Sequence, residues 1–296
     1  MARPQNVAGA VFRIMTDCIL IADRPRPFLK WVGGKRQLLD ELESRIADAR
    51  PHKRYHEPFV GGGALFFDLY SRKDLGRCKA ALSDNNGRLI EAYHGVQENV
   101  ERVINILKVH RSLHDKEYYY QVRAQIPEDP VARTARIIYL NRTCFNGLFR
   151  ENSKGGFNVP MGRYKDPKIC DAPNLRAVSK ALQRCTVKEE HFAAILNAAK
   201  SGDFVYFDPP YVPVSKTSSF TAYHKGEFGE ASQRELAAVY DELTKKGVKA
   251  LLSNSDTPLV HELYQRHCIE LVQASRKINS RADKRGKVNE VLVRNF

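Results

Sequence analysis

The sequence predicts an α/β fold of the Rossmann-like type, and three features support this prediction. An apolar strand over residues 204–207 stops at an Asp-Pro-Pro-Tyr sequence, residues 208–211. Residues 55–67 run from a second strand through a turn of three glycines into an apolar helix. The acid Asp84 follows the last of these glycines by 21 residues, after a third apolar segment. Open α/β sheets bind ligands at the carboxyl ends of their strands, so the three loops are expected along one edge.

The loop after the first of these strands has the groups that bind a planar base carrying an amino group. Asp208 and the carbonyl of Pro209 can accept both hydrogens of an exocyclic amine, and Tyr211 can stack on a flat ring. The two prolines fix φ and donate no backbone hydrogen bond, which stiffens the loop. Asp208, Pro209 and Tyr211 are therefore the candidate catalytic residues.

The glycine turn is suited to a nucleotide-like ligand. Gly61 and Gly63 can adopt positive φ and let a ligand approach the backbone closely. In nucleotide-binding α/β folds an acid about 20 residues past the glycines, placed like Asp84, binds ribose hydroxyls. A dehydrogenase is disfavoured, because the turn lacks the G-x-G-x-x-G spacing and the Asp-Pro-Pro-Tyr loop would have no role.

The charge balance favours a polyanionic partner such as nucleic acid. The 296 residues include 48 Lys and Arg against 34 Asp and Glu, a net charge of +14. Residues 108–184 hold 15 of the basic and 7 of the acidic side chains, a net +8. This concentration favours a surface that faces phosphates. The length suits one large or two modest domains with a sizeable core.

Cysteine usage and hydropathy argue against several other classes. The six cysteines show no C-x-x-C pair and no metal-ligand spacing with histidine, so we expect buried thiols in a reducing compartment and no bound metal. No run of about 18 apolar residues occurs, which predicts that no helix spans a membrane. The first 27 residues are too polar for a signal-peptide core, and Met15 rivals Met1 as the true start.

Four motifs in a fixed order resemble those of the Dam-type DNA adenine-N6 methyltransferases, in the alpha group of amino-methyltransferases. They are Phe-Leu-Lys-Trp-Val-Gly-Gly-Lys at 28–35, Glu-Pro-Phe-Val-Gly-Gly-Gly at 57–63, Asp-Asn-Asn at 84–86 and Asp-Pro-Pro-Tyr at 208–211. The resemblance extends from residue 28 to residue 292. It implies S-adenosyl-L-methionine as cofactor and transfer of its methyl group to the 6-amino group of adenine in double-stranded DNA.

The resemblance also implies a domain organisation. Residues 28–87 and 186–296 would form the catalytic methyltransferase domain, and residues 88–185 an inserted, mostly helical target-recognition domain that carries a β-hairpin. Residues 1–27 would be an N-terminal extension. The protein is expected to be a monomer in the cytoplasm of a bacterial, archaeal or phage-type source, associated with the nucleoid through DNA.

Cofactor contacts are implied at positions that match the family motifs. The implied cofactor-binding residues are Trp31, Lys35, Phe59, Gly61, Gly63, Asp84, Phe192 and Asp208. Lys35 is expected to reach the methionine carboxylate of the cofactor or a backbone phosphate, and Phe192 to contact the adenine ring of the cofactor. His191 is expected at the polar rim rather than as a catalytic base.

Residues 141–164 are similar to the recognition region of Dam enzymes that methylate GATC. Basic and aromatic side chains between glycines over residues 146–164 also favour a β-hairpin that probes a groove. The matching positions are, for base contacts, Leu148, Arg150, Pro160 and Tyr164 and, for wedging at the flipped base, Phe145 and Asn146. Arg150 suits bidentate contact with a guanine edge. Phe145 stands where the family often has Tyr, so stacking is kept but a hydroxyl contact is not.

Hydrophobic periodicity and turn residues predict the remaining elements. Helices are expected over residues 37–49, 88–108, 116–125, 131–140, 174–183 and, capped by Ser232, as far as residue 243. A strand and turn are expected over residues 187–192 and 249–257, and a closing strand over 290–293. The polar, aromatic loop 215–228 is expected to close over DNA, and the basic loop 276–287 to contact phosphates.

Three alternative functions stay open at this point. The Asp-Pro-Pro-Tyr loop could serve the amine of cytosine, although that group more often carries Ser than Asp. The substrate could be RNA, because a flipped base does not report its sugar. The chain could also be a sequence-specific DNA-binding protein without catalysis, against which Asp208, Tyr211 and Asp84 argue. A role beside an independently acting restriction endonuclease and an orphan role both fit the sequence.

Overall fold

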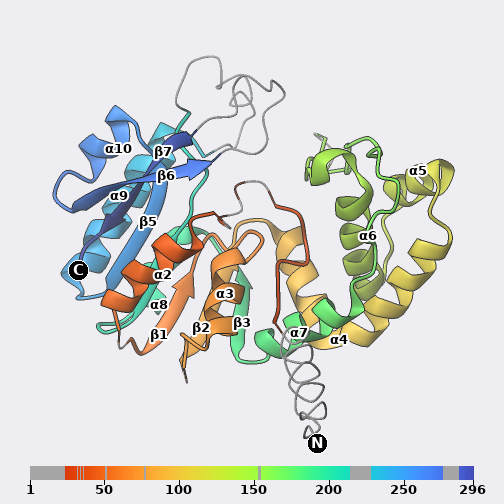
Figure 1. Ribbon diagram of the computed structural model, residues 1–296, viewed down its shortest axis with the longest axis horizontal. Helices are drawn as coiled ribbons and strands as arrows, with labels where there is room; N and C mark the ends of the chain where they lie inside the picture. The colour runs from red at the N-terminus through yellow and green to blue at the C-terminus, as the bar shows by residue number, and fades with distance from the viewer. Residues whose placement is uncertain are drawn as a thin grey trace, which may run out of the picture. The chain divides into compact units, whose positions relative to one another are not determined.

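Figure 1 shows the computed structural model, which describes residues 24–31, 33, 35, 37–50, 52–76, 78–152, 155–213, 228–275 and 287–296. The chain forms two compact units. Of the described residues, the first unit holds those within 24–32, 70–72 and 91–183, and the second those within 33–69, 73–90 and 184–296. Every strand of the described sheet belongs to the second unit.

The second unit is built on a sheet of seven described strands in the order β3-β2-β1-β4-β5-β7-β6. The first five strands of the chain pair in parallel, whereas β7 lies antiparallel between β5 and β6. β1 has β2 on one side and β4 on the other, so the strand order reverses beside β1, and ligands bind at the carboxyl ends next to such a switch point. The strands are β1 (Arg54–Glu57), β2 (Lys79–Asp84), β3 (Cys185–Glu189), β4 (Phe204–Phe207), β5 (Lys249–Ser255), β6 (Cys268–Ser275) and β7 (Lys287–Arg294).

Helices cover both faces of this sheet. On one face, Leu236 and Tyr240 of α9 pack in a core with Leu252 of β5 and Val293 of β7. α2 lies on the opposite face, where its Arg45 pairs with Glu270 of β6. The helices that lie wholly or mainly in this unit are α2 (Leu39–Asp48), α3 (Ala64–Arg72), the 3-10 turn η2 (Phe192–Ala194), α8 (Ile195–Ala198), α9 (Glu230–Lys245) and α10 (Pro258–Leu263).

The first unit is helical. Its elements are α4 (Gly87–Ser112), whose first turn belongs to the second unit, α5 (Lys116–Ala124), α6 (Pro130–Thr143), the 3-10 turn η1 (Phe145–Gly147) and α7 (Ala172–Leu182). Asp115 and Asp129 cap α5 and α6, since their carboxylates accept the backbone N–H of the third helical residue. α4 and α6 approach closely at Gly95, where an added Cβ would lie 2.1 Å from Oγ1 of Thr134. Only glycine fits that position without displacing Thr134.

The predicted α/β class is confirmed, and most predicted helices and strands occur with ends shifted by a few residues. One capping prediction is wrong: α9 begins at Glu230 with Gly229 in the cap position, so Ser232 lies inside the first turn. No pattern in the sequence predicts β6. It is an edge strand in which Leu271 is 63% exposed, so its apolar residues do not follow the usual pattern of burial.

The β-hairpin predicted over residues 146–164 is not a pair of regular strands. Among the described residues of this region, two isolated antiparallel bridges occur, Cys144 with Met161 and Glu151 with Phe157. Gly155 adopts a positive φ of 72°, and Pro160 has no N–H to donate, so a continuous ladder is interrupted. Within the described parts of the chain, no helix is both long enough and apolar enough to cross a lipid bilayer.

Candidate active site

Three acidic side chains stand at the carboxyl ends of three neighbouring strands of the second unit. Asp84 is the last residue of β2, Glu57 is the last of β1, and Asp208 directly follows β4. Burial raises the pKa of each of these carboxyl groups above its ordinary value. The end of the sheet next to the switch point therefore concentrates carboxylates in a poorly solvated environment, a feature typical of functional sites.

Asp208 is held by one of its two carboxylate oxygens. The ammonium of Lys35 lies 2.9 Å from Oδ1, and Oγ of Ser253 donates to the same Oδ1 at 3.0 Å. Desolvation raises the pKa of Asp208, and both Lys35 and Ser253 oppose that rise. The other oxygen, Oδ2, accepts no hydrogen bond from any residue that the structure describes. The carboxylate is thus anchored on one side and available as an acceptor on the other.

The ring of Tyr211 is fixed from two directions. The ammonium of Lys35 lies over the ring, 4.2 Å from its centroid, in a cation–π contact. The phenol hydroxyl donates to Oε2 of Glu290 on β7 at 2.6 Å. Burial, together with nearby carboxylates, raises the pKa of the phenol well above its ordinary value, so Tyr211 remains a neutral donor.

The backbone of the Asp-Pro-Pro-Tyr loop is tied to β5 and α9. The buried amide of Gln233 donates to the carbonyl of Pro210 at 2.9 Å. The backbone N–H of Val212 donates to the side chain of Asn254 at 3.2 Å, and Oγ of Ser255 donates to the Val212 carbonyl at 2.6 Å. Proline rigidity and these three hydrogen bonds together restrain the backbone of the loop.

The glycine turn after β1 is stabilised by the neighbouring strand. Gly61 and Gly63 have φ values of 48° and 68°, in the left-handed region that glycine adopts without strain. Asp84 accepts the N–H of Gly61 on Oδ2 and the N–H of Asn86 on Oδ1, both at 3.0 Å. The acid predicted to bind a ligand therefore also holds the turn in place.

Aromatic rings pack beside this turn. Phe59 stacks on Phe192 with ring centroids 5.4 Å apart and an interplanar angle of 25°. Phe228 contacts both rings edge-on, at 5.5 Å and 5.6 Å. The predicted cofactor residues Phe59 and Phe192, which lie far apart in the sequence, are thus brought together.

In the first unit, the predicted recognition residues lie on two adjacent segments. The N–H of Phe145 donates to the carbonyl of Pro160, and the N–H of Gly162 donates to the carbonyl of Thr143, both at 2.8 Å. These bonds bring Phe145, Asn146 and Leu148 alongside Pro160 and Tyr164. Phe145 is 49% exposed and Tyr164 36%, which is unusual for large apolar side chains. Asn146 has a positive φ of 54°.

Lys30 and Asn141 contact the segments that carry these recognition residues. The buried side chain of Asn141 accepts the N–H of Lys30 at 2.6 Å and donates to the carbonyls of Lys30 and Gly147, at 2.8 Å and 3.0 Å. The ammonium of Lys30 lies 4.0 Å from the ring centroid of Tyr164. Arg150 is exposed, and its Nε donates to Asn158 at 2.7 Å.

Comparison with known proteins identifies the family. Residues 31–278 match the family of D12 class N6 adenine-specific DNA methyltransferases. The chain belongs to this family.

Similar members of the family come from bacteria and archaea. A type II methyltransferase of Lactococcus lactis subsp. cremoris, M1.LlaDCHI, is 41% identical over 92% of this chain and 95% of its own length. M.MjaIII, a type II methyltransferase of Methanocaldococcus jannaschii, is 42% identical over 92% of this chain and 99% of its own length. The DNA adenine methylase of Escherichia coli K12 is 36% identical over 90% of this chain and 94% of its own length.

The predicted residues of this methyltransferase divide between the two units. Lys35, Phe59, Gly61, Gly63, Asp84, Phe192, Asp208, Pro209 and Tyr211 belong to the second unit. Trp31 belongs to the first, where its ring lies 5.6 Å from that of Phe149. The ammonium of Lys35 lies 2.9 Å from Asp208, and its expected contact with a carboxylate of the cofactor or with a phosphate stays a prediction. Loop residues 215–227 and 276–286 and Lys154 lie outside the described residues.

Several contacting residues are absent from the sequence-based set: Lys30, Glu57, Asn141, Ser253 and Glu290. Lys30, Glu57 and Asn141 stand inside stretches that carry the resemblance, which is a local signal for them. Ser253 lies in the strand and turn expected over residues 249–257. Glu290 lies in the predicted closing strand, but no local pattern indicates which loop that strand meets.

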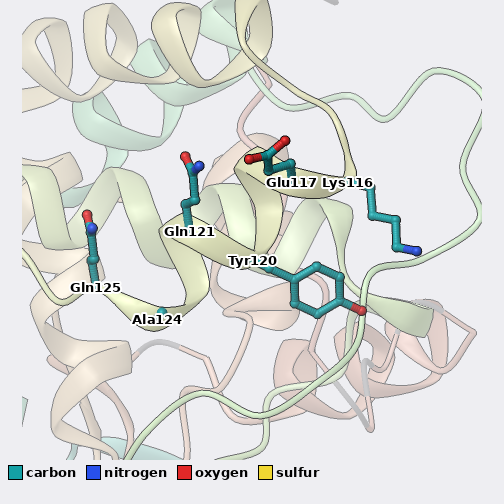
Figure 2. A pocket seen from close by; sticks show the side chains of 6 residues that line it. All are labelled: Lys116, Glu117, Tyr120, Gln121, Ala124 and Gln125. Carbon is teal, nitrogen blue, oxygen red and sulfur yellow. The ribbon is translucent and has the colours of Figure 1, made fainter.

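The hollow in Figure 2 lies elsewhere, on α5 of the first unit. It is shallow and is lined by Lys116, Glu117, Tyr120, Gln121, Ala124 and Gln125. Five of these residues belong to α5 and Gln125 is its C-cap, and none is a predicted site residue.

Glu57 gives a prediction about stability. The hydroxyl of Tyr55 donates to its buried carboxyl at 2.8 Å, and burial, with Asp208 and Asp84 nearby, raises the pKa of Glu57 from 4.5 to about 8. The folded protein therefore binds this proton more tightly than the unfolded chain does. The contribution of Glu57 to the free energy of unfolding is fully present below about pH 4.5 and is lost as the pH rises to about 8.

Urea denaturation of the wild type and of Glu57→Gln at several pH values tests this. Gln does not titrate, so the free energy of unfolding of the wild type should fall relative to that of the variant between about pH 4.5 and about pH 8. A difference that stays constant across this range would show that Glu57 has an ordinary pKa.

Proposed function

We propose that this methyltransferase transfers a methyl group from S-adenosyl-L-methionine to the 6-amino group of adenine in duplex DNA, within GATC, after rotating the adenine out of the helix. One observation carries the proposal: Asp208 is anchored through Oδ1 by Lys35 and Ser253, its Oδ2 accepts no hydrogen bond from the described residues, and the same Lys35 lies over the ring of Tyr211. A cytosine amine remains the alternative substrate for the same acceptors.

The residues after β1 and β2 fit the cofactor. The left-handed glycines keep the turn free of side chains, so a ligand can approach its backbone. Asp84 provides a carboxylate at the end of β2, and the stacked rings of Phe59 and Phe192 provide an apolar contact for adenine. When bound, the cofactor supplies an electrophilic sulfonium methyl group.

The chemistry follows from the acceptors on the Asp-Pro-Pro-Tyr loop. An adenine inside a duplex cannot reach them, and unstacking it costs a few kcal/mol, roughly, which stacking on Tyr211 offsets in part. Oδ2 of Asp208 and the carbonyl of Pro209 would accept the two amine hydrogens, which favours a tetrahedral nitrogen with its lone pair directed away from the ring system. Lys35 lowers the pKa of Asp208 against the larger effect of burial, which favours the ionised form that acts as an acceptor and not as a donor.

Positioning and electrostatics supply most of this catalysis. The amine does not need to lose a proton before it attacks. Once the nitrogen carries the methyl group it must release one proton, and the carboxylate of Asp208 that already accepts this hydrogen can take it. The stiff loop, tied by Gln233 and Asn254, holds the acceptors in a fixed geometry.

Recognition is assigned to the first unit. We propose that residues 88–185 form the target-recognition domain and that residues 28–87 and 186–296 form the catalytic domain. Leu148, Arg150, Pro160 and Tyr164 would contact bases, and the exposed Phe145 with Asn146 would wedge at the flipped adenine. The net +8 of residues 108–184 supports a phosphate-facing surface.

Methylation of defined duplexes tests the proposal. Purified protein with labelled S-adenosyl-L-methionine should produce N6-methyladenine in a GATC duplex and none in a matched GTTC duplex. Asp208→Ala should abolish methylation but leave DNA affinity largely intact, whereas Glu262→Gln, at an exposed ion pair with Arg234, should behave like the wild type. Methylation of both duplexes would reject GATC specificity, label on cytosine would reject adenine, and loss of DNA binding in Asp208→Ala would reject the role given to Asp208.

Arg150 gives a prediction about specificity. A bidentate arginine–guanine contact contributes about 1–3 kcal/mol of discrimination, so Arg150→Ala should reduce the preference for GATC over a site with one altered G·C pair by roughly 5- to 150-fold. The measurement is kcat/KM on the two duplexes. Arg163→Ala, at an exposed arginine on the same segment, is the matched control and should lower kcat/KM equally on both duplexes. If Arg150→Ala, like Arg163→Ala, lowered kcat/KM equally on both duplexes, a base contact by Arg150 would be contradicted.

A further inference from the structure

We propose that Glu290 is a positioning residue for methyl transfer, which acts through the hydroxyl of Tyr211 to fix the direction of the ring on which the target base stacks. The inference rests on the proposed function. It concerns a residue that neither the motifs nor the spacing of the sequence assigns to the site.

The contact itself is short and charge-assisted. The hydroxyl of Tyr211 donates to Oε2 of Glu290 at 2.6 Å, although the two residues are 79 positions apart in the chain. Hydrogen bonds from a hydroxyl to a carboxylate are shorter and about twice as strong as those between neutral groups. The geometry therefore matches a strong anchor for the end of the ring farthest from the backbone.

The sheet explains how Glu290 reaches this place. β7 runs antiparallel to β5, so the first half of β7 lies at the edge where the parallel strands end. Glu290 is paired in register with Ser255 of β5 on one side and with Val272 of β6 on the other. β5 also supplies Ser253 and Asn254 to the same loop. Strands on both sides thus hold the backbone of Glu290.

The other contacts of the loop do not fix the ring in this way. Gln233 and Asn254 hold the backbone at Pro210 and Val212, which leaves the torsions of the Tyr211 side chain free. Lys35 lies over one face of the ring, which opposes rotation of the ring about its own long axis. Among the described residues, Glu290 is the one that binds the hydroxyl, so it fixes the direction of that long axis and the place of the ring. Stacking in a reactive geometry depends on that place.

A set of variants separates positioning from general stability. Tyr211→Phe keeps the ring but removes the hydroxyl, Glu290→Ala removes the acceptor, and Glu290→Gln keeps an acceptor without charge. We expect the single-turnover rate on a GATC duplex to fall about 10- to 100-fold in Tyr211→Phe and Glu290→Ala, and less in Glu290→Gln. The double variant Tyr211→Phe/Glu290→Ala should be no slower than either single variant, and KM for S-adenosyl-L-methionine should be unchanged.

Glu270→Gln is the matched control. Glu270 lies on β6 and pairs with Arg45 and Arg294 away from the Asp-Pro-Pro-Tyr loop, so its loss weakens the same part of the sheet without touching Tyr211. We expect a lower free energy of unfolding but a wild-type rate. The inference would be overturned if the rate losses of Tyr211→Phe and Glu290→Ala added in the double variant. It would also be overturned if the rate of Glu270→Gln were as low as that of Glu290→Ala.

An NMR measurement reports the contact without relying on catalysis. Among the 13 tyrosines, the ring Cζ signal of Tyr211 is the one missing from Tyr211→Phe. It should shift in Glu290→Ala and Glu290→Gln and stay in place in Glu270→Gln. If the wild type methylates adenine but this signal does not respond to Glu290, the positioning role is wrong. If the signal responds but no duplex is methylated at adenine, the proposed function is wrong, and the positioning role in methyl transfer falls with it.

Discussion

The ion pair between Lys35 and Asp208 is the interaction on which the rest of the site depends. Taking two charges out of water is costly unless they are paired and hydrogen-bonded, and removing one partner of such a pair typically costs about 3–5 kcal/mol. Here the side chain of Lys35 is 9% exposed and that of Asp208 is 21% exposed. Lys35 offsets the burial of the carboxylate, occupies its Oδ1 together with Ser253, and packs on the ring of Tyr211. The candidate acceptor and the candidate stacking ring are thus organised around one ammonium group.

The strand order provides the frame for this arrangement. Because β1 is the switch point, the ends of β2, β1 and β4 lie side by side, and each carries an acid. The antiparallel β7 adds a fourth carboxylate, that of Glu290, from a strand that starts at the edge where the others finish. Burial at this edge raises the pKa values of Glu57, Asp84 and Asp208, and Lys35 and backbone N–H groups oppose this rise at Asp208 and Asp84.

Much of this could be predicted from the sequence where the signal is local. The strand that ends at Asp208, the glycine turn and the spacing to Asp84 each depend on a few adjacent residues. The structure also brings the rings of Phe59 and Phe192 together, and their role as cofactor contacts stays a prediction. The pairing of Lys35 with Asp208 and of Tyr211 with Glu290 could not be predicted, because it depends on the order and direction of strands. The same holds for β6, an edge strand without regular burial, and for the hairpin, where glycine and proline interrupt the ladder.

The pH dependence of single-turnover methyl transfer in Lys35→Met tests the central claim most directly. In the wild type the rate should fall as Asp208 is protonated, and because burial raises its pKa this acid limb should lie above the usual range of an aspartate. Removing the ammonium of Lys35 raises the pKa of Asp208 further, so the acid limb should move to higher pH. Lys249→Met, at a lysine that donates to the Ala49 carbonyl, should leave the limb in place. An acid limb that is unchanged in Lys35→Met would contradict the claim that Lys35 keeps the acting carboxylate ionised.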